Sequence, residues 1–185
     1  MDNGASSYRR FLDGDDSGFV SIINDYMDGL LFYINKLVGN MSVAEDITED
    51  TFVKIITKKP RFSGKSSFKT WLYAIGRNTA VDYLKKKAKY SVLPIEECIQ
   101  LSDDEISLEI SYIREERKII IHRALRRLKP EYSQILWLIY FENFSNKEAA
   151  IIMGKSVHNI ETLAYRARCS LRSELEKEGF IYEES

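Results

Sequence analysis

The spacing of apolar residues constrains the fold of this chain more than any other feature of its sequence. From residue 17 to residue 38 an apolar side chain recurs every three or four positions, which places one apolar stripe along a helix. Similar spacing returns through most of the 185 residues, and no stretch stands out with the strict alternation of a half-buried strand. Hydrophobic residues make up 44% of the chain, which is enough to form packed cores. We therefore predict an all-α fold.

Helix start and stop signals divide this fold into two small domains. Gly39 is a stop signal, and Ser42 and Glu45 have the capping-box spacing that opens a helix. Residues 91–112 contain Pro94 and many acids but no helical period, so we interpret them as a flexible, acidic linker between domains 1–90 and 113–185. The expected helices cover residues 17–38, 42–59, 66–87, 113–128, 131–142, 146–153 and 157–176.

Charge is strongly segregated along the chain, although the formal total is only −1. Residues 58–89 hold ten basic residues and one acid, whereas residues 91–118 hold eight acids and three bases. Blocks of this kind raise the question of what each part of the chain contacts, and the mean charge does not answer it.

Cysteine usage and the absence of long apolar runs favour a cytoplasmic protein. Cys98 and Cys169 are isolated from each other in sequence and form no disulfide framework. No apolar run approaches the roughly 20 residues that cross a bilayer. The first ten residues lack the basic-then-apolar order of a secretory signal. We expect no direct insertion into a membrane.

The sharpest functional pattern lies between residues 145 and 168. Ser145 and Glu148 have capping-box spacing, so a helix is expected to begin there. Ala150, Gly154 and Ile160 then stand where a helix-turn-helix needs a small residue, a turn residue and an apolar anchor. The second helix, which Ser156 can cap, would direct a group of side chains into a DNA major groove: His158, Asn159, Thr162, Tyr165 and Arg166. An ordinary helical hairpin with a chance glycine is the alternative.

A second pattern combines positive charge with an aromatic side chain on the helix expected over residues 66–87. One side of this helix carries Phe68, Trp71, Leu72, Ile75 and Asp82, and the opposite side carries Lys65, Lys69, Tyr73 and Arg77. Phosphate contact together with base stacking is how many proteins hold single-stranded nucleic acid. A solvated charged face is the alternative, and lysines at a helix C-terminus also favour the helix dipole.

An acidic cluster formed by Glu45, Asp46, Glu49 and Asp50 covers two turns of the helix expected over residues 42–59. No histidine is near in sequence, so the cluster is a poor metal or acid–base site, and acids at a helix start are common for dipole reasons. A protein-binding face is the better functional alternative. The sequence has no phosphate loop, zinc-ligand spacing or nucleophile elbow, and His122 is expected to be a surface or packing residue. We expect no cofactor, no metal and no catalytic residue.

Three stretches carry a resemblance to a known family. The first is AEDITEDTF at residues 44–52, and the second runs from FSG at 62–64 through FKTWLYAIGRNTAVD at 68–82. The third joins residues 125–130 with the helix-turn-helix pattern at 145–168. Together they resemble the group IV, or extracytoplasmic-function (ECF), sigma factors of the sigma-70 family of bacterial RNA polymerase. The resemblance extends over most of the chain, residues 19–89 and 117–176. It implies a domain similar to sigma region 2, followed by a domain similar to sigma region 4.

The resemblance implies a role for each pattern. Core polymerase would be bound by Asp46, Glu49, Asp50 and Phe52. The minus-ten element and its opened strand would be held by Arg61, Ser63, Lys65, Ser66, Lys69, Trp71, Tyr73, Arg77 and Asn78, although Trp71 is expected mainly in the core. The minus-thirty-five duplex would be read by Ser156, His158, Asn159, Glu161, Thr162, Tyr165 and Arg166.

The implied function is that of a non-enzymatic specificity subunit, which directs polymerase to promoters and assists their melting. Its expected partners are core RNA polymerase, at the clamp coiled coil and the flap, promoter DNA in double-stranded and melted form, and an anti-sigma factor. Two competing hypotheses are a free-standing DNA-binding regulator that uses only the helix-turn-helix, and a helical enzyme acting on nucleic acid. The second would need a metal or acid–base cluster, which the sequence does not offer.

The recognition helix departs from the family pattern at two positions, and a third departure lies just before it. The family often has Thr-Val-Lys-Ser-Arg where this chain has NIETL at residues 159–163, so Glu161 and Leu163 each replace a positive charge. We expect weaker phosphate affinity and an altered base preference, since a carboxylate can accept from the cytosine amino group. Lys155 stands where an apolar residue is usual.

Overall fold

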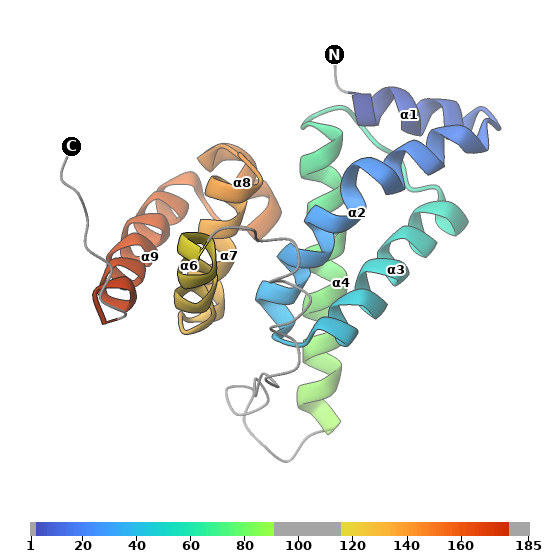
Figure 1. Ribbon diagram of the computed structural model, residues 1–185. Helices are drawn as coiled ribbons and strands as arrows, with labels where there is room; N and C mark the ends of the chain where they lie inside the picture. Colours follow the sequence, from blue (N-terminus) through green and yellow to red (C-terminus); the bar gives the residue numbers. More distant parts are fainter. Residues whose placement is uncertain (1–2, 91–115, 178–185) are drawn as a thin grey trace.

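The computed structural model describes residues 3–90 and 116–177, and both ranges are largely helical (Figure 1). The first range holds α1 (Asn3–Leu12), α2 (Asp16–Val38), α3 (Met41–Lys58) and α4 (Phe68–Tyr90). The second holds α6 (Glu116–Arg126), α7 (Pro130–Leu136), the π-helical turn η3 (Trp137–Phe141), α8 (Asn146–Met153) and α9 (Val157–Lys177). No strand occurs in these two ranges. The all-α fold with two helical domains is confirmed, and the predicted linker at 91–112 lies outside the described residues.

The ends of α2 and α3 follow local signals, one of which differs from the prediction. Gly39 ends α2 in the left-handed region with φ of 68°, a conformation that glycine adopts without cost. The predicted capping box at Ser42 is wrong, because α3 begins at Met41 and its cap is Asn40. The Asn40 side chain accepts from the Val43 backbone N–H at 2.9 Å. Asn40 is the N-cap because it lies just before the first helical turn with an extended backbone, whereas Ser42 lies inside that turn.

Helix α1 precedes the helical spacing seen in the sequence and was not predicted. It packs along α2, and Gly18 of α2 makes the contact close, since a Cβ there would stand 2.9 Å from the Phe11 backbone nitrogen. Its residue Tyr8 is buried and donates a hydrogen bond to the Pro60 carbonyl at 2.7 Å. Helix α1 therefore ties the loop after α3 to the rest of the first domain.

The core of the first domain lies between α2, α3 and α4. Ile22, Leu30, Ile34, Ile55 and Leu72 are completely buried there. An aromatic cluster closes the core beside the loop after α3; its members are Tyr8, Phe62, Phe68 and Trp71, with ring centroids 5.3–5.7 Å apart. This packing agrees with the expectation that Trp71 belongs mainly to the core.

The second domain has the predicted helix-turn-helix in α8 and α9. Ser145 and Glu148 form both hydrogen bonds of the capping box, as predicted, and Gly154 ends α8 with φ of 63°. Ala150 and Ile160 are buried where α8 and α9 meet. The helix predicted over residues 131–142 is divided, because α7 gives way at Trp137 to the π-helical turn η3. There the Trp137 and Phe141 rings stack with centroids 4.3 Å apart.

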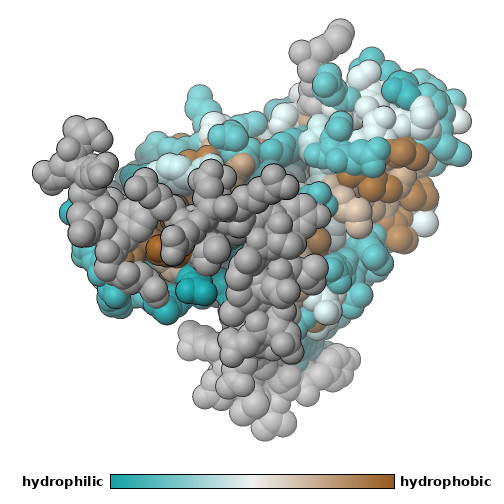
Figure 2. Space-filling view, viewed as in Figure 1, coloured by the Kyte–Doolittle hydropathy of each residue, from teal (hydrophilic) through white to brown (hydrophobic). Residues whose placement is uncertain are grey.

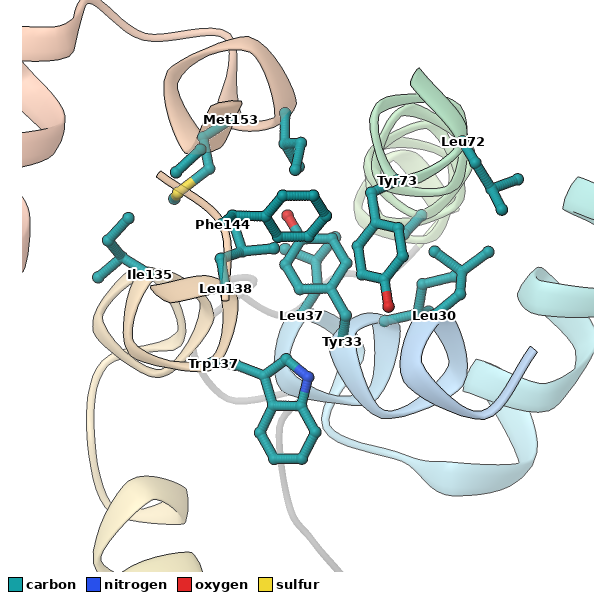
Figure 3. Close-up of a cluster of buried hydrophobic side chains, with 14 of the residues drawn as sticks. Leu30, Tyr33, Leu37, Leu72, Tyr73, Ile135, Trp137, Leu138, Phe144 and Met153 are labelled. Carbon is teal, nitrogen blue, oxygen red and sulfur yellow. The ribbon is translucent and has the colours of Figure 1, made fainter. Parts of the chain in front are cut away.

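The two domains pack against each other through α8 and η3 on one side and α4 and α2 on the other (Figure 1). Figure 3 shows the buried side chains at this contact, where Phe144 of the second domain meets Tyr73 of α4, and Tyr73 in turn packs on Tyr33 of α2. Helix α4 is consequently enclosed on two sides. Among the described helices, none is long and apolar enough to cross a membrane.

Candidate nucleic-acid and protein interfaces

The predicted acidic cluster lies on the outer face of α3. Glu45, Asp46, Glu49 and Asp50 are all exposed. The opposite side of α3 faces the core, and this orients the four acids outward. On that side Thr48 and Thr51 are buried and donate hydrogen bonds to backbone carbonyls one turn earlier, at 2.7 and 2.8 Å. The four carboxylates therefore form one accessible, negatively charged surface.

Phe52 lies on the other side of α3. Its side chain is buried and packs edge-on against Phe19 at a centroid distance of 6.2 Å, so in this structure Phe52 supports the acidic face from within the core. A direct contact between Phe52 and polymerase remains a prediction.

Exposed apolar side chains continue the acidic face along α3, and sequence reasoning missed them. Val53 and Ile56 are 53% and 42% exposed, and they follow Glu49 at the i+4 and i+7 positions of the same helix face. Leu12 and Val20 are exposed on α1 and α2. Figure 2 shows apolar surface gathered where these first three helices meet, at the right of the view. The sequence signal that could have identified Val53 is its i+4 spacing from Glu49, which places it on the same helix face.

The loop between α3 and α4 presents three of its predicted DNA-binding residues to solvent. Arg61, Ser63 and Lys65 are exposed, while Ser66 is half-buried. Two contacts hold the loop to the core of the first domain. The Phe62 ring packs on Phe68 and Trp71, and the Pro60 carbonyl accepts a hydrogen bond from Tyr8 of α1. A basic, polar loop is thus held on a rigid aromatic base.

The predicted stripe on α4 is less accessible than its helical wheel indicated. Tyr73 was expected on a solvated side but is fully buried, and it donates a hydrogen bond to Glu142 of η3's C-terminal end at 2.8 Å. Lys69 forms an ion pair with the same carboxylate at 2.8 Å. The reason is the second domain, which covers this side of α4.

Farther along α4 the predicted residues differ in exposure. Arg77 is half-buried beside Tyr33, Asn78 is exposed, and the lysines at 85–87 and 89 are exposed. Burial raises the pKa of Tyr33 well above its ordinary value, against a smaller opposing effect of the Arg77 guanidinium. Burial and the Glu142 carboxylate likewise raise the pKa of Tyr73, so both phenols stay neutral.

The recognition helix α9 presents most of its predicted residues outward. Ser156 caps the helix by accepting from the Asn159 backbone N–H at 3.2 Å. Thr162 is half-buried and donates to the His158 carbonyl at 3.1 Å. The predicted groove-facing side chains that are exposed are His158, Asn159, Glu161, Tyr165 and Arg166. Ile151 and Val157 are also exposed at the turn.

Two departures from the family pattern have structural explanations. Lys155 forms an ion pair with Glu131 of α7 at 3.2 Å, so its charge is used within the domain. Leu163 is partly buried and packs against the core of the second domain. Lys155 thus has an ion-pair partner within its own domain, and Leu163 contributes packing where the family often has a positive charge.

Residues 3–90 and 116–177 contain no group of three histidine, cysteine or acidic side chains that could hold a metal ion. Cys169 is a free, exposed thiol on α9.

Comparison with known proteins assigns both domains. Residues 22–90 match the family model for Sigma-70 region 2, and residues 118–171 match the model for Sigma-70, region 4. RNA polymerase sigma factor YlaC of Bacillus subtilis is 28% identical over 157 residues, which are 84% of this chain and 91% of that protein. ECF RNA polymerase sigma factor BldN of Streptomyces coelicolor is 30% identical over 83% of this chain and 59% of that protein.

A solved structure supports the same fold. The sigma factor RpoE, in complex with the anti-sigma factor NepR from Bartonella quintana, aligns with a TM-score of 0.66 at 22% identity. The alignment covers 85% of this chain and 96% of that one. With regions 2 and 4 in order on one chain, and with ECF sigma factors among its relatives, this protein belongs to the ECF sigma factors of the sigma-70 family.

Proposed function

We propose that this chain docks on core RNA polymerase through the outer face of α3 and reads promoter DNA with the loop after α3, α4 and α9. As an ECF sigma factor it is a non-catalytic specificity subunit that directs polymerase to promoters for transcription initiation. The observation that carries the residue assignment is the exposed face of α3, because a free-standing regulator needs no second interaction surface beside its helix-turn-helix.

The α3 face fits the clamp coiled coil in chemistry. Its four carboxylates offer complementary charge to a basic partner, and complementary charge steers association and fixes orientation. Val53 and Ile56 add apolar area that a partner helix can bury. We assign docking to the exposed acids together with these two residues. Contact with the flap of the polymerase is assigned to the second domain by family resemblance alone.

The loop after α3 and the exposed end of α4 suit an opened strand. Arg61 and Lys65 supply positive charge at the loop, and Asn78 supplies an amide on α4. Single-stranded DNA is held by such combinations of charge and planar groups. Lys69 and Tyr73 belong to the same proposed surface once the second domain is displaced.

The exposed residues of α9 suit a major groove. His158, Asn159 and Glu161 lie in the first turns of the recognition helix, the part that contacts base edges in helix-turn-helix proteins. Tyr165 and Arg166 follow one turn later, where a phosphate contact is within reach.

The cell compartment proposed is the cytoplasm, where polymerase and chromosome lie. An anti-sigma partner is proposed by resemblance to its family.

Charge reversal on α3 tests the proposal against the free-standing regulator. We expect Asp46→Lys with Glu49→Lys to abolish capture of core RNA polymerase by the tagged chain, because two attractive contacts become repulsive. Asp25→Lys with Asp28→Lys is the matched control, since these exposed acids lie on α2 of the same domain and should leave capture intact. Undiminished capture by the α3 variant would remove α3 from the docking role.

A further inference from the structure

Glu142 occupies the part of α4 to which DNA binding is assigned. Its carboxylate lies 2.8 Å from the Lys69 ammonium and accepts the Tyr73 hydroxyl at 2.8 Å. Lys69 also donates to the Glu142 backbone carbonyl at 3.0 Å. Only 11% of the Glu142 side chain is exposed, and 32% of the Lys69 side chain. Both donors therefore have a negatively charged partner from the other domain.

A second carboxylate makes a parallel contact one turn away. Glu148 accepts hydrogen bonds from Thr70 at 3.2 Å and from Ser67 at 3.4 Å, at the start of α4. The same side chain closes the capping box of α8 through Ser145. Partial burial raises the pKa of Glu148, but hydrogen bonds from Ser145, Thr70 and Ser67 outweigh it and lower the pKa below the ordinary value. Glu148 is thus ionised at neutral pH and faces α4.

Apolar packing lies between the two places where Glu142 and Glu148 contact α4. Phe144, which follows Glu142 by two residues, meets the Tyr73 ring edge-on at 5.0 Å (Figure 3). The Lys69 ammonium lies 4.8 Å from the centre of the Phe144 ring. On the far side Gly29 of α2 leaves just enough room, because a Cβ there would meet the Tyr73 hydroxyl and stand 2.8 Å from a Glu142 carboxylate oxygen.

We propose that Glu142, Phe144 and Glu148 form a self-docking surface that competes with single-stranded DNA for Lys69, Tyr73 and Thr70. A carboxylate on a lysine and a tyrosine hydroxyl takes the place that a strand phosphate would take, and Phe144 covers the ring on which a base would stack. The two occupants exclude each other. The inference rests on the proposed function, because it requires that α4 binds the opened strand.

Competition of this kind lowers the apparent affinity of the free chain for DNA. Only the undocked fraction binds, so a tenfold excess of the docked form weakens binding by about tenfold. Docking of α3 on polymerase leaves this contact unaltered by itself, because the α3 face lies on another side of the first domain. Separation of the two domains is the step that exposes α4.

Two variants disrupt the docking contact without substituting any residue of α4. Glu142→Gln removes the charge that pairs with Lys69 and keeps the side-chain shape. Gly29→Ala introduces a methyl group that displaces the Tyr73–Glu142 hydrogen bond from the α2 side, while alanine favours the helix that contains it. Glu176→Gln is the matched control, because it removes one charge from an exposed ion pair inside the second domain.

The measurement is fluorescence anisotropy of a labelled single-stranded oligonucleotide with the full chain, alongside small-angle scattering. We expect both release variants to bind the oligonucleotide several-fold more tightly and to have a larger radius of gyration, with the control unchanged. A larger radius without tighter binding, or neither change in a folded variant, would overturn the competition.

One further variant separates this inference from the proposed function. Lys65 is exposed on the loop, so Lys65→Ala tests the strand contact without touching the self-docking surface. Weaker binding by Lys65→Ala together with unaltered binding by Glu142→Gln refutes self-docking and leaves the proposed function standing. Unaltered binding by Lys65→Ala, Glu142→Gln and Gly29→Ala alike removes the strand contact itself, and the self-docking proposal with it.

Discussion

At the scale of single residues, Glu148 shows how one side chain serves two levels of structure. Its carboxylate accepts from the Ser145 backbone N–H at the start of α8, and it also accepts a hydrogen bond from Thr70 of α4. The capping box was predicted from the spacing of Ser145 and Glu148, because caps depend on local sequence. The contacts with Ser67 and Thr70 were not predicted, because they join residues about 80 positions apart through the packing of two domains.

Stability at low pH should depend on Glu148. Its pKa is lowered in the folded chain, so the stabilisation is fully present above the ordinary value of 4.5 and is lost as the pH falls through the lowered value. We expect urea unfolding, followed by circular dichroism, to show a smaller loss of stability between about pH 6 and pH 3 for Glu148→Gln than for the unaltered chain. Equal losses in the two chains would mean that other carboxylates carry the pH dependence.

At the scale of helices and turns, the helix-turn-helix was predictable because local signals set it. Capping residues, the turn glycine and the buried positions of α9 all lie within a short stretch, and α8 has the predicted bounds. The surroundings of helix α4 were harder to predict. A helical wheel assigns faces but not neighbours, so Tyr73 was placed toward solvent although the second domain buries it. The π-helical turn at Trp137–Phe141 likewise has no sequence signal that distinguishes it from ordinary helix.

The turn between α8 and α9 should be sensitive to a single methyl group. Gly154 has φ of 63°, and a Cβ there would have no neighbour within 4 Å, so Gly154→Ala carries only the backbone cost of about 1 kcal/mol. We expect a lower urea midpoint for the second domain. Gly64→Ala, with φ of 70° and equally open surroundings, is the matched control in the first domain. A lower midpoint for the second domain with Gly64→Ala would contradict this assignment.

At the scale of the whole molecule, the uneven charge distribution corresponds to separate surfaces. The acidic face of α3 points outward from the first domain, and the basic loop and exposed end of α4 lie on the same domain but on other elements. The family and the order of the two domains could be predicted from three motifs. The arrangement of the domains could not, because it depends on Glu142, Phe144 and Gly29, which carry no recognisable pattern in the sequence.

Promoter-dependent transcription by core RNA polymerase tests the central claim most directly. The measurement is sequencing of transcript 5′ ends made from genomic DNA by core enzyme, with and without the purified chain. We predict a small set of start sites that appears only when the chain is added, and that disappears with Asp46→Lys and Glu49→Lys on α3. The same start sites with and without the chain, at equal yield, would contradict the account.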